Sequence, residues 1–261
     1  MLNGLLKLYK RNDKRKSGQK FYDRERNKRK INMKLGIMQP YFLPYIGYFQ
    51  LINAVDKYVI YDDVNYIKGG WINRNKLLLN EKEFMFNLIL SGASPNKLIN
   101  EVLVAANQSK LLKTIEGAYK KAPYFNEVLP VILSIVEYED KNLARFIGNS
   151  LIQIADYLKF NTIFMCSSEL QKNYSLKAQD KVINICSVLQ ATQYFNAFGG
   201  MGLYSKSDFE TNNIKLCFLK PQPIEYKQFN NKFVPNLSML DVLMFNPVEE
   251  INKLLYKYDL I

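Results

Sequence analysis

The stretch KLGIMQPYFLPYIGYFQLINAVDKYVIYDDV, residues 34–64, indicates the fold class of this chain. Its first five residues, 34–38, are typical of a short buried strand. A mostly buried helix should follow, with Pro44 in its first turn, where the missing N–H of proline costs nothing. The apolar positions that support this helix are Ile46, Phe49, Leu51, Ile52 and Val55. Because β-branched and aromatic residues then predict a strand at 57–64, the pattern is β-α-β, which implies parallel strands joined by a right-handed crossover.

The rest of the chain contains a helical middle followed by a return to strand and helix alternation. A strand is expected at 82–90, with 98–105 as its partner, and amphipathic helices are expected near 108–121, 125–138 and 141–158. The alternation resumes with strands at 161–166, 193–197 and 214–219 and helices at 177–191, 238–245 and 247–258. We therefore predict an α/β fold, an open and mostly parallel sheet with helices on both faces. The segment at about 106–158 should be a mainly helical insertion or cap.

The strong positive charge of the chain is concentrated in its first residues. The formal net charge is +12, and residues 1–32 hold twelve Lys or Arg and three Asp or Glu, so they carry +9 of it. The remaining residues are nearly balanced at +3. We expect residues 1–32 to be a basic, disordered leader and residues 33–261 to be a single domain. The leader is interpreted as a segment upstream of the true start at Met33 or as a solvated tail; a basic arm for membrane or nucleic acid is the less favoured alternative.

Several classes of site are excluded or disfavoured by composition. The chain has no histidine, which excludes Ser-His-Asp and Cys-His catalysis and histidine-based zinc sites. Its three cysteines, Cys166, Cys186 and Cys217, lie far apart without a Cys-x-x-Cys pair, so they are expected to be free buried thiols in a reducing cytosol. We predict no metal site. No uninterrupted apolar run is long enough to span a membrane.

The first candidate motif, QPYFLPYIGYF at 39–49, directly follows the first predicted strand. Ligands of open parallel sheets bind beyond the carboxyl ends of the strands, so this turn is placed to contact one. The Gln39 amide can donate and accept hydrogen bonds. Gly47 would permit close packing or close approach of a ligand. A proline-rich turn whose aromatic side chains fill the core explains the same residues and stays open.

The second motif, DDVNYIKGGWINRNK at 62–76, should be a loop after the second strand. Because adjacent residues at a strand end point to opposite faces, either Asp62 or Asp63 should face the ligand crevice. The carboxylates are the candidate catalytic groups. Cations that suit phosphate or carboxylate ligands, and aromatic rings that suit a base or sugar, follow them: Lys68, Arg74, Lys76, Tyr66 and Trp71. The alternative is a solvated basic loop ordered by Asn73 and Asn75.

Two later motifs carry weaker signals. YFNAFGGMGLY at 194–204 places a glycine-rich turn after a strand, where backbone N–H groups can approach phosphate, but it lacks a full dinucleotide or Walker motif. Asn196, Gly199 and Gly200 are its candidate ligand contacts, with Tyr204 as a lid; an ordinary turn is the equal alternative. In FVPNLSMLDVL at 233–243, Ser238 and Asp241 are predicted to form a capping-box-like helix start.

The order of these motifs resembles the WbqC-like protein family. The shared motifs are QPxxxPxxGYF at 39–49, Asp-Asp-Val at 62–64, Trp-x-Asn-Arg-Asn-Lys at 71–76, Asn-x-x-Gly-Gly at 196–200 and Pro-x-x-Ser-x-x-Asp at 235–241. The resemblance runs from about residue 34 to about residue 246 and leaves the leader outside. Tyr45 departs from the tryptophan expected in many relatives, but it keeps an aromatic surface.

The resemblance implies a cytoplasmic bacterial protein that takes part in making surface polysaccharide of the O-antigen (lipopolysaccharide) type, and it supplies no catalytic residues. We favour an N-acyl or aminoacyl transferase, or an ATP-using ligase, that acts on a nucleotide-linked amino sugar; the alternative is a non-catalytic nucleotide-sugar-binding or assembly protein. The cofactor is left open between ATP and a nucleotide-sugar ligand. In the enzyme hypothesis Asp62 or Asp63 accepts a proton. The predicted substrate-binding residues are Gln39, Tyr41, Tyr45, Tyr48, Trp71, Asn73, Arg74, Asn75, Lys76, Asn196, Gly199, Gly200 and Tyr204.

Overall fold

A mixed, mostly parallel sheet carries the candidate sites. The computed structural model describes residues 32–106, 108–229 and 232–261, and residues 33–261 form one unit. The sheet strands are β1 (Lys34–Met38), β2 (Lys57–Ile60), β7 (Ile163–Cys166), β8 (Gln193–Ala197), β9 (Lys215–Pro221) and β10 (Tyr258–Leu260), in the order β10-β9-β8-β1-β2-β7. All neighbours pair in parallel except β9 and β10, which are antiparallel. The predicted α/β fold is therefore confirmed, and the predicted leader lies outside the described residues apart from Asn32.

The strand order identifies where ligands are expected. Numbered along the chain, the six strands run 3-2-1-4-5-6 across the sheet, so the order reverses between β1 and β8. In open sheets of this kind, ligands bind outside the carboxyl ends of the strands near such a reversal. The turns after β1 and β8 thus begin at the position where a site is expected.

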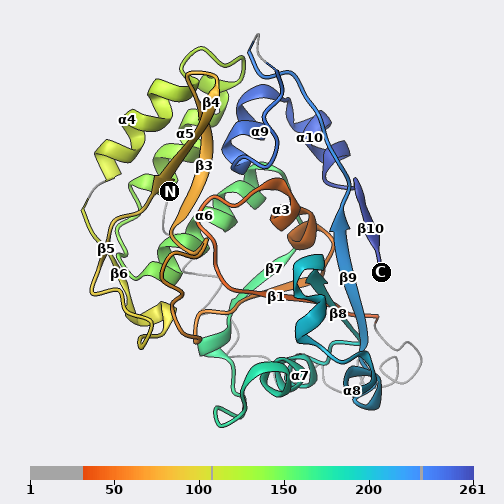
Figure 1. The fold of residues 1–261 in the computed structure, drawn as a ribbon. Coiled ribbons are helices and arrows are strands. Elements are labelled where there is room, and N and C mark those ends of the chain that lie inside the picture. Colours follow the sequence, from red (N-terminus) through yellow and green to blue (C-terminus); the bar gives the residue numbers. More distant parts are fainter. Residues whose placement is uncertain (1–31, 107, 230–231) are drawn as a thin grey trace, which may run out of the picture. The chain divides into compact units, whose positions relative to one another are not determined.

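Helices cover both faces of the sheet (Figure 1). One face packs against α3 (Ile46–Asn53), α6 (Leu143–Tyr157), α9 (Met239–Phe245) and α10 (Val248–Leu254), and α4 (Gln108–Tyr119) and α5 (Phe125–Val136) extend this apolar core. The other face packs against α7 (Ala178–Val188) and α8 (Lys206–Thr211). Side chains of β1 alternate between the faces, so Leu35 and Ile37 belong to the second core. The three middle helices share a core with α3 and α9, and whether they act as a cap stays a prediction.

A hairpin precedes the helical middle, and it corrects two expectations. Residues 74–76 were expected in a loop, but they begin β3 (Arg74–Leu79), which pairs antiparallel with β4 (Lys82–Asn87). The predicted pairing of 82–90 with 98–105 is limited to β5 (Leu90–Ser91) and β6 (Leu103–Val104). The two-residue turn of the hairpin has positive φ at Asn80 and Glu81, 49° and 65°, as tight hairpins require.

Two boundaries near the first motif also differ from expectation. The strand expected at 57–64 ends at Ile60, so both aspartates lie in the following loop. Pro44 precedes α3 instead of lying in its first turn, because Tyr45 is the extended N-cap residue and the Pro44 carbonyl accepts a hydrogen bond from Met239 N at 2.8 Å. Short 3-10 helices complete the fold: η1 (Ile99–Glu101), η2 (Ser167–Glu169) and η3 (Phe198–Leu203).

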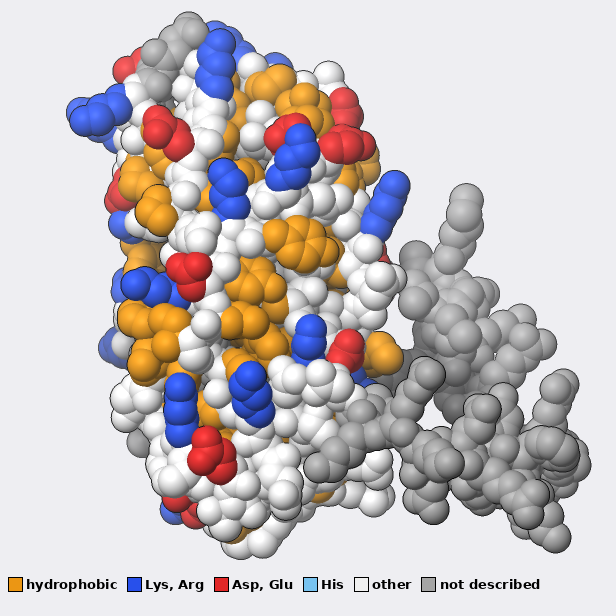
Figure 2. All heavy atoms as spheres, turned by 90° about the vertical axis from the view of Figure 1, so that its right-hand side faces the viewer, with side chains coloured by type: hydrophobic (Ala, Val, Ile, Leu, Met, Phe, Trp, Pro, Cys, Tyr) orange, Lys and Arg blue, Asp and Glu red, His pale blue; other side chains and the backbone are white. Residues whose placement is uncertain are grey.

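The surface along the antiparallel edge of the sheet carries both positive and negative side chains. Figure 2 shows the face that carries β9, β10 and α10, where hydrophobic side chains lie among scattered basic and acidic ones. Tyr256, Leu260 and Ile261 are exposed hydrophobic residues of this chain end. Among the described residues seen on this face, the basic side chains form no continuous stripe, in line with the near-balanced charge of residues 33–261.

Candidate functional site: two cavities that share Tyr45 and Asn236

The first cavity, called here the Trp71 pocket, brings three of the sequence motifs together. Its volume is about 370 Å³, and it is lined by Tyr41, Pro44, Tyr45, Trp71, Asn75, Lys76 and Asn236. Five of these seven residues were predicted from the first and second motifs; Pro44 and Asn236 were not. Asn236 lies in the motif at 233–243, two residues before the Ser238 helix cap. A polar residue next to a predicted helix start was therefore the sequence feature that could have identified it.

The ring of Tyr45 is held in the wall of this pocket by a glycine two residues later. A Cβ atom on Gly47 would lie 2.4 Å from Cε2 and 2.6 Å from Cζ of Tyr45. Because real Cβ atoms do not approach an aromatic ring so closely, only glycine at 47 allows Tyr45 to fold over the start of α3. The Gly-Tyr ending of the first motif therefore serves close packing of a pocket residue.

The turn at 41–45 is fixed by hydrogen bonds from the two other segments. The Leu43 carbonyl accepts a bond from Asn75 Nδ2 at 2.9 Å and one from Ser238 Oγ at 2.7 Å. Ser238 N in turn donates to the Lys76 carbonyl at 2.8 Å. Leu43 has a positive φ of 45°, an unusual conformation for a leucine, and these partners hold it there. Since each motif binds another, the pocket geometry is built before any ligand arrives.

Trp71 and its neighbours supply the aromatic and charged part of the pocket. Trp71 is 44% exposed, and the Arg74 guanidinium carbon lies 5.7 Å from the centre of the indole ring. Arg74 also donates to the Gly69 carbonyl, so it braces the loop that carries the tryptophan. Lys76 is the charged residue among the described pocket lining, and its Nζ lies 2.6 Å from Glu83 Oε2. Burial raises the pKa of Tyr41 and of Tyr45, so both hydroxyl groups are protonated donors at neutral pH.

Asp62, one of the two predicted catalytic carboxylates, has structural partners and lines neither cavity. Its side chain accepts bonds from Ser168 N at 2.9 Å and from Ser168 Oγ at 2.5 Å. It thereby joins the loop after β2 to η2, the 3-10 helix that follows β7. A catalytic role for this carboxylate stays a prediction.

Asp63 forms a buried ion cluster with two lysines and also lines neither cavity. Its Oδ2 lies 2.9 Å from Lys172 Nζ and 3.1 Å from Lys181 Nζ, and all three side chains are at most 10% exposed. Burial by itself raises the pKa of Asp63, but the hydrogen bonds from Lys172 and Lys181 lower it more, so the net direction is down. Asp63 is thus held ionised by two cations, and its predicted catalytic role is not tested by these contacts.

The other predicted substrate-binding residues lie outside the Trp71 pocket lining. Tyr48 is buried and donates to the Gln39 carbonyl at 2.7 Å, whereas the half-buried Gln39 amide makes no hydrogen bond within the described residues. Asn73 accepts a bond from the Tyr66 hydroxyl at 2.9 Å and donates to the Leu88 carbonyl at 2.9 Å. Both sets of contacts order the chain itself.

The glycine-rich turn after β8 is built around Asn196. Asn196 is buried and accepts a bond from Ala197 N at 2.7 Å, and a Cβ on Gly200 would lie 2.7 Å from its Nδ2. Tyr204 packs on Tyr194 with ring centres 5.7 Å apart, in the core on the other face of the sheet. The structure therefore does not bring Asn196, Gly199, Gly200 and Tyr204 into the Trp71 pocket.

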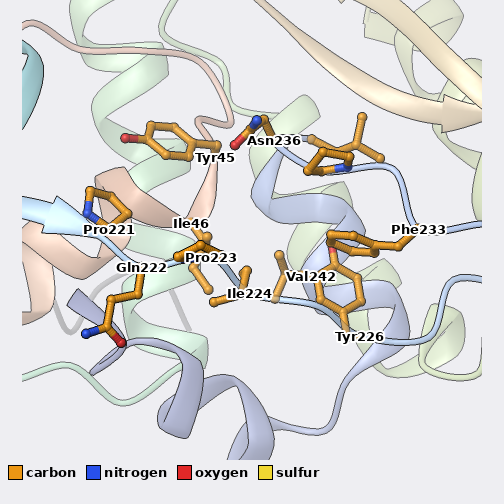
Figure 3. A pocket seen from close by; sticks show the side chains of 12 residues that line it. Tyr45, Ile46, Pro221, Gln222, Pro223, Ile224, Tyr226, Phe233, Asn236 and Val242 are labelled. Atoms are coloured by element: carbon orange, nitrogen blue, oxygen red, sulfur yellow. The ribbon is translucent and has the colours of Figure 1, made fainter.

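The second cavity, called here the proline groove, was not predicted. It measures about 320 Å³ and lies between the start of α3, the segments 221–226 and 233–237, and α9 (Figure 3). It is lined by Tyr45, Ile46, Pro221, Gln222, Pro223, Ile224, Tyr226, Phe233, Pro235, Asn236, Leu237 and Val242. Three prolines at and after the carboxyl end of β9 were the signal in the sequence, but proline is also ordinary in connecting loops.

Asp241 is hydrogen-bonded to a residue that lines this groove and to two further side chains. Its carboxylate accepts bonds from Tyr226 at 2.7 Å, Gln228 at 2.5 Å and Tyr119 at 2.9 Å. Burial raises the pKa of Asp241, although these hydrogen bonds act in the opposite direction. The prediction of a helix cap was right for Ser238, which accepts a bond from Leu240 N at 3.2 Å. It was wrong for Asp241, because this side chain turns into the core instead of reaching back to residue 238.

Other kinds of site find no support in the described part of the chain. No group of His, Cys, Asp and Glu side chains there is arranged to hold a metal ion. The three cysteines are free, as predicted; Cys186 and Cys217 are also buried as expected, whereas Cys166 is only partly buried. No described helix combines the length and apolar character needed to cross a membrane.

Comparison with known proteins relates the chain to one protein family. The model of the WbqC-like protein family matches residues 39–253. The chain is also 26% identical over 222 residues to the uncharacterized protein Rv1507c of Mycobacterium tuberculosis, and the aligned region covers 82% of this chain and 93% of the mycobacterial protein. No solved structure matches the chain significantly.

Proposed function

The chain belongs to the WbqC-like protein family, and from this premise and the geometry of the Trp71 pocket we propose that it acts on a sugar during the making of surface polysaccharide. The sugar is a nucleotide-linked amino sugar, bound in the Trp71 pocket. The reaction is the attachment of an acyl or aminoacyl group to the sugar amine, by a transferase or a ligase. The observation that carries the proposal is a pocket that combines aromatic faces with amide and hydroxyl groups.

The lining of the pocket fits a sugar better than it fits other ligand classes. Aromatic rings of Tyr41, Tyr45 and Trp71 offer flat apolar faces to the C–H groups of a sugar ring, while their polar tips and the amides of Asn75 and Asn236 match its hydroxyl groups. Pockets for small ligands commonly combine apolar walls with a few placed polar groups in this way. A volume of about 370 Å³ suits one sugar unit with part of its linked phosphate.

The charged residues near the pocket support the nucleotide-linked form of the sugar. Lys76 lines the pocket and is paired only with the part-exposed Glu83, an ion pair that a diphosphate can replace at small cost. The Arg74 guanidinium lies over the indole ring of Trp71. Its guanidinium fork is suited to a diphosphate that enters beside the indole ring.

A binding protein without catalysis is the second candidate. The observation that favours it is that neither cavity has an aspartate or glutamate in its lining. A transferase that removes a proton from the amine would then need Asp62, Asp63 or a group of the substrate. The two candidates differ in one measurement, since only the enzyme consumes a donor and releases an acylated sugar nucleotide.

The test is ligand binding by a matched pair of aromatic variants. Nucleoside diphosphate amino sugars should raise the melting temperature, because a ligand that binds only the folded state stabilises it, whereas free nucleotides should raise it less. Trp71→Ala should weaken binding by roughly tenfold, as expected for the loss of one aromatic stacking contact. Tyr256→Ala, which removes an exposed aromatic ring that lines neither cavity, should leave affinity unchanged. Equal affinities of wild type and a folded Trp71→Ala protein would overturn the proposal.

A further inference from the structure

The proline groove is an uncharged cavity that the proposed sugar site does not use. None of its twelve lining residues carries a charge. Pro221, Pro223 and Pro235 stiffen its rim, and Ile224, Leu237, Val242 and Phe233 supply apolar walls. When an apolar group binds in a rigid cavity, few protein groups have to be ordered, so the entropic cost of binding is small.

Two polar side chains of the groove already have partners within the protein. The Tyr226 hydroxyl donates to Asp241 at 2.7 Å, and Gln222 Nε2 donates to Asp259 Oδ1 at 2.8 Å. A diphosphate or the zwitterion of a free amino acid would therefore lose its hydration in the groove without meeting an opposite charge. A neutral apolar group avoids this loss.

The groove adjoins the Trp71 pocket, because two residues belong to the lining of both. Tyr45 and Asn236 line both cavities. Figure 3 shows these two residues along one side of the groove, above Ile224 and Val242. A group bound in the groove thus lies one side chain away from a sugar in the Trp71 pocket.

We propose that the proline groove binds the apolar acyl group of a second substrate, next to the sugar in the Trp71 pocket. The role of this group as the one transferred rests on the proposed function, whereas its binding in the groove does not. The inference narrows the donor to a neutral acyl chain and disfavours a free amino acid. Tyr45 and Asn236 then form the boundary between donor and acceptor.

The probes for this inference are the acetyl, butyryl and hexanoyl thioesters of N-acetylcysteamine, with free glycine as the charged comparison. Wild-type affinity should rise about fourfold for each added CH₂ group until the groove is filled, because each buried CH₂ adds a constant hydrophobic gain. Ile224→Trp fills the groove and should abolish this dependence on chain length. Ile163→Trp, the same exchange at an exposed position on the far edge strand β7, should retain it.

Two further measurements keep the outcomes separate. If Ile224→Trp fails to fold, Ile224→Ser replaces it, and this smaller polar side chain should reduce the gain per CH₂ group. Binding of the nucleotide sugar is measured in the same variants. Sugar binding that depends on Trp71, without any dependence of thioester affinity on chain length or on residue 224, overturns the acyl groove alone. Chain-length dependence that Ile224→Trp removes supports the groove even where no sugar binds.

Discussion

The missing side chain of Gly47 leaves the space that the Tyr45 ring occupies in the wall of the site. The Tyr45 ring lies so close to Gly47 that a Cβ atom on residue 47 would be 2.4 Å from Cε2 of the ring. Tyr45 also contributes to both cavities. The position of a single ring thus shapes the wall of both cavities.

The replacement of Gly47 by alanine should therefore destabilise the protein although alanine favours helices. We expect Gly47→Ala to lower the free energy of unfolding by about 1–3 kcal/mol, the usual cost of overpacking. Gly117→Ala in α4 is the matched control, because a Cβ there meets nothing within 4 Å. It should raise the free energy of unfolding by up to about 1 kcal/mol.

Urea unfolding of both variants measures these opposite signs. In a Tyr45→Ser background the penalty of Gly47→Ala should largely vanish, because the clashing ring is gone. A penalty of the same size in both backgrounds would show that Gly47 serves something other than Tyr45.

At the scale of elements, Asp63 connects the end of β2 to α7. Its two lysine partners come from different places, Lys172 from the loop after η2 and Lys181 from α7 itself. Lys181 Nζ also donates to the Asp63 carbonyl at 2.8 Å. The cluster thus fixes a helix against the carboxyl end of a strand.

Asp63→Asn should cost roughly 3–5 kcal/mol of stability at neutral pH, since it leaves buried cations without a counter-charge. Glu83→Gln, which breaks the part-exposed ion pair with Lys76, should cost less than about 1 kcal/mol. Equal losses in chemical unfolding would contradict the burial argument.

Because the pKa of Asp63 is lowered, the stability that Asp63 contributes is present above the ordinary carboxyl pKa and is lost as the pH falls through the lowered value.

The elements that the sequence predicts well are those with long periodic apolar patterns. The strands at 34–38 and 193–197 have the predicted bounds, and the three middle helices begin and end within a few residues of expectation. β3 was missed because RNKLLL shows no alternation and its turn, Asn80-Glu81, lacks the usual glycine. β10 was missed because three residues at a chain end carry too little pattern.

The candidate site was predictable where its residues follow the sheet strands in dense motifs. Tyr41, Tyr45, Trp71, Asn75 and Lys76 stand in two such motifs and meet in one pocket. The proline groove was not predictable in this way, because its walls come from Tyr45, the segments 221–226 and 233–237, and α9, which only the folded chain brings together.

At the scale of the whole molecule, Asp241 joins parts of the chain that lie far apart in sequence. It binds Tyr119 of α4 and both Tyr226 and Gln228 of the segment along the proline groove. The Tyr119 hydroxyl also accepts a bond from Leu78 N of β3 at 3.0 Å. One buried carboxylate thus connects α9, the helical middle, the hairpin and the groove.

This arrangement predicts a stability that depends on pH with a definite sign. The folded-state pKa of Asp241 is raised above the ordinary value of 3.8, so the folded protein binds a proton more tightly than the unfolded chain does. The contribution of Asp241 to the free energy of unfolding therefore falls as the pH rises through the raised value. The lowered pKa of Asp63 acts only below the ordinary carboxyl value, so the two effects occupy different pH ranges.

Asp241→Asn should remove this pH dependence of stability and weaken the hydrogen bonds that residue 241 accepts. The amide NH₂ group cannot accept hydrogen bonds from Tyr226 and Gln228, so we expect a loss of about 1–3 kcal/mol at neutral pH. The stability advantage of wild type over the variant should increase as the pH is lowered from neutral toward the ordinary carboxyl pKa, because only wild type gains from protonation. Urea unfolding at several pH values measures this advantage, and Asp180→Asn, which removes an exposed carboxylate from α7, controls for the change in net charge. An advantage that shrinks on acidification would show that the three hydrogen bonds outweigh burial and that Asp241 is held as a carboxylate.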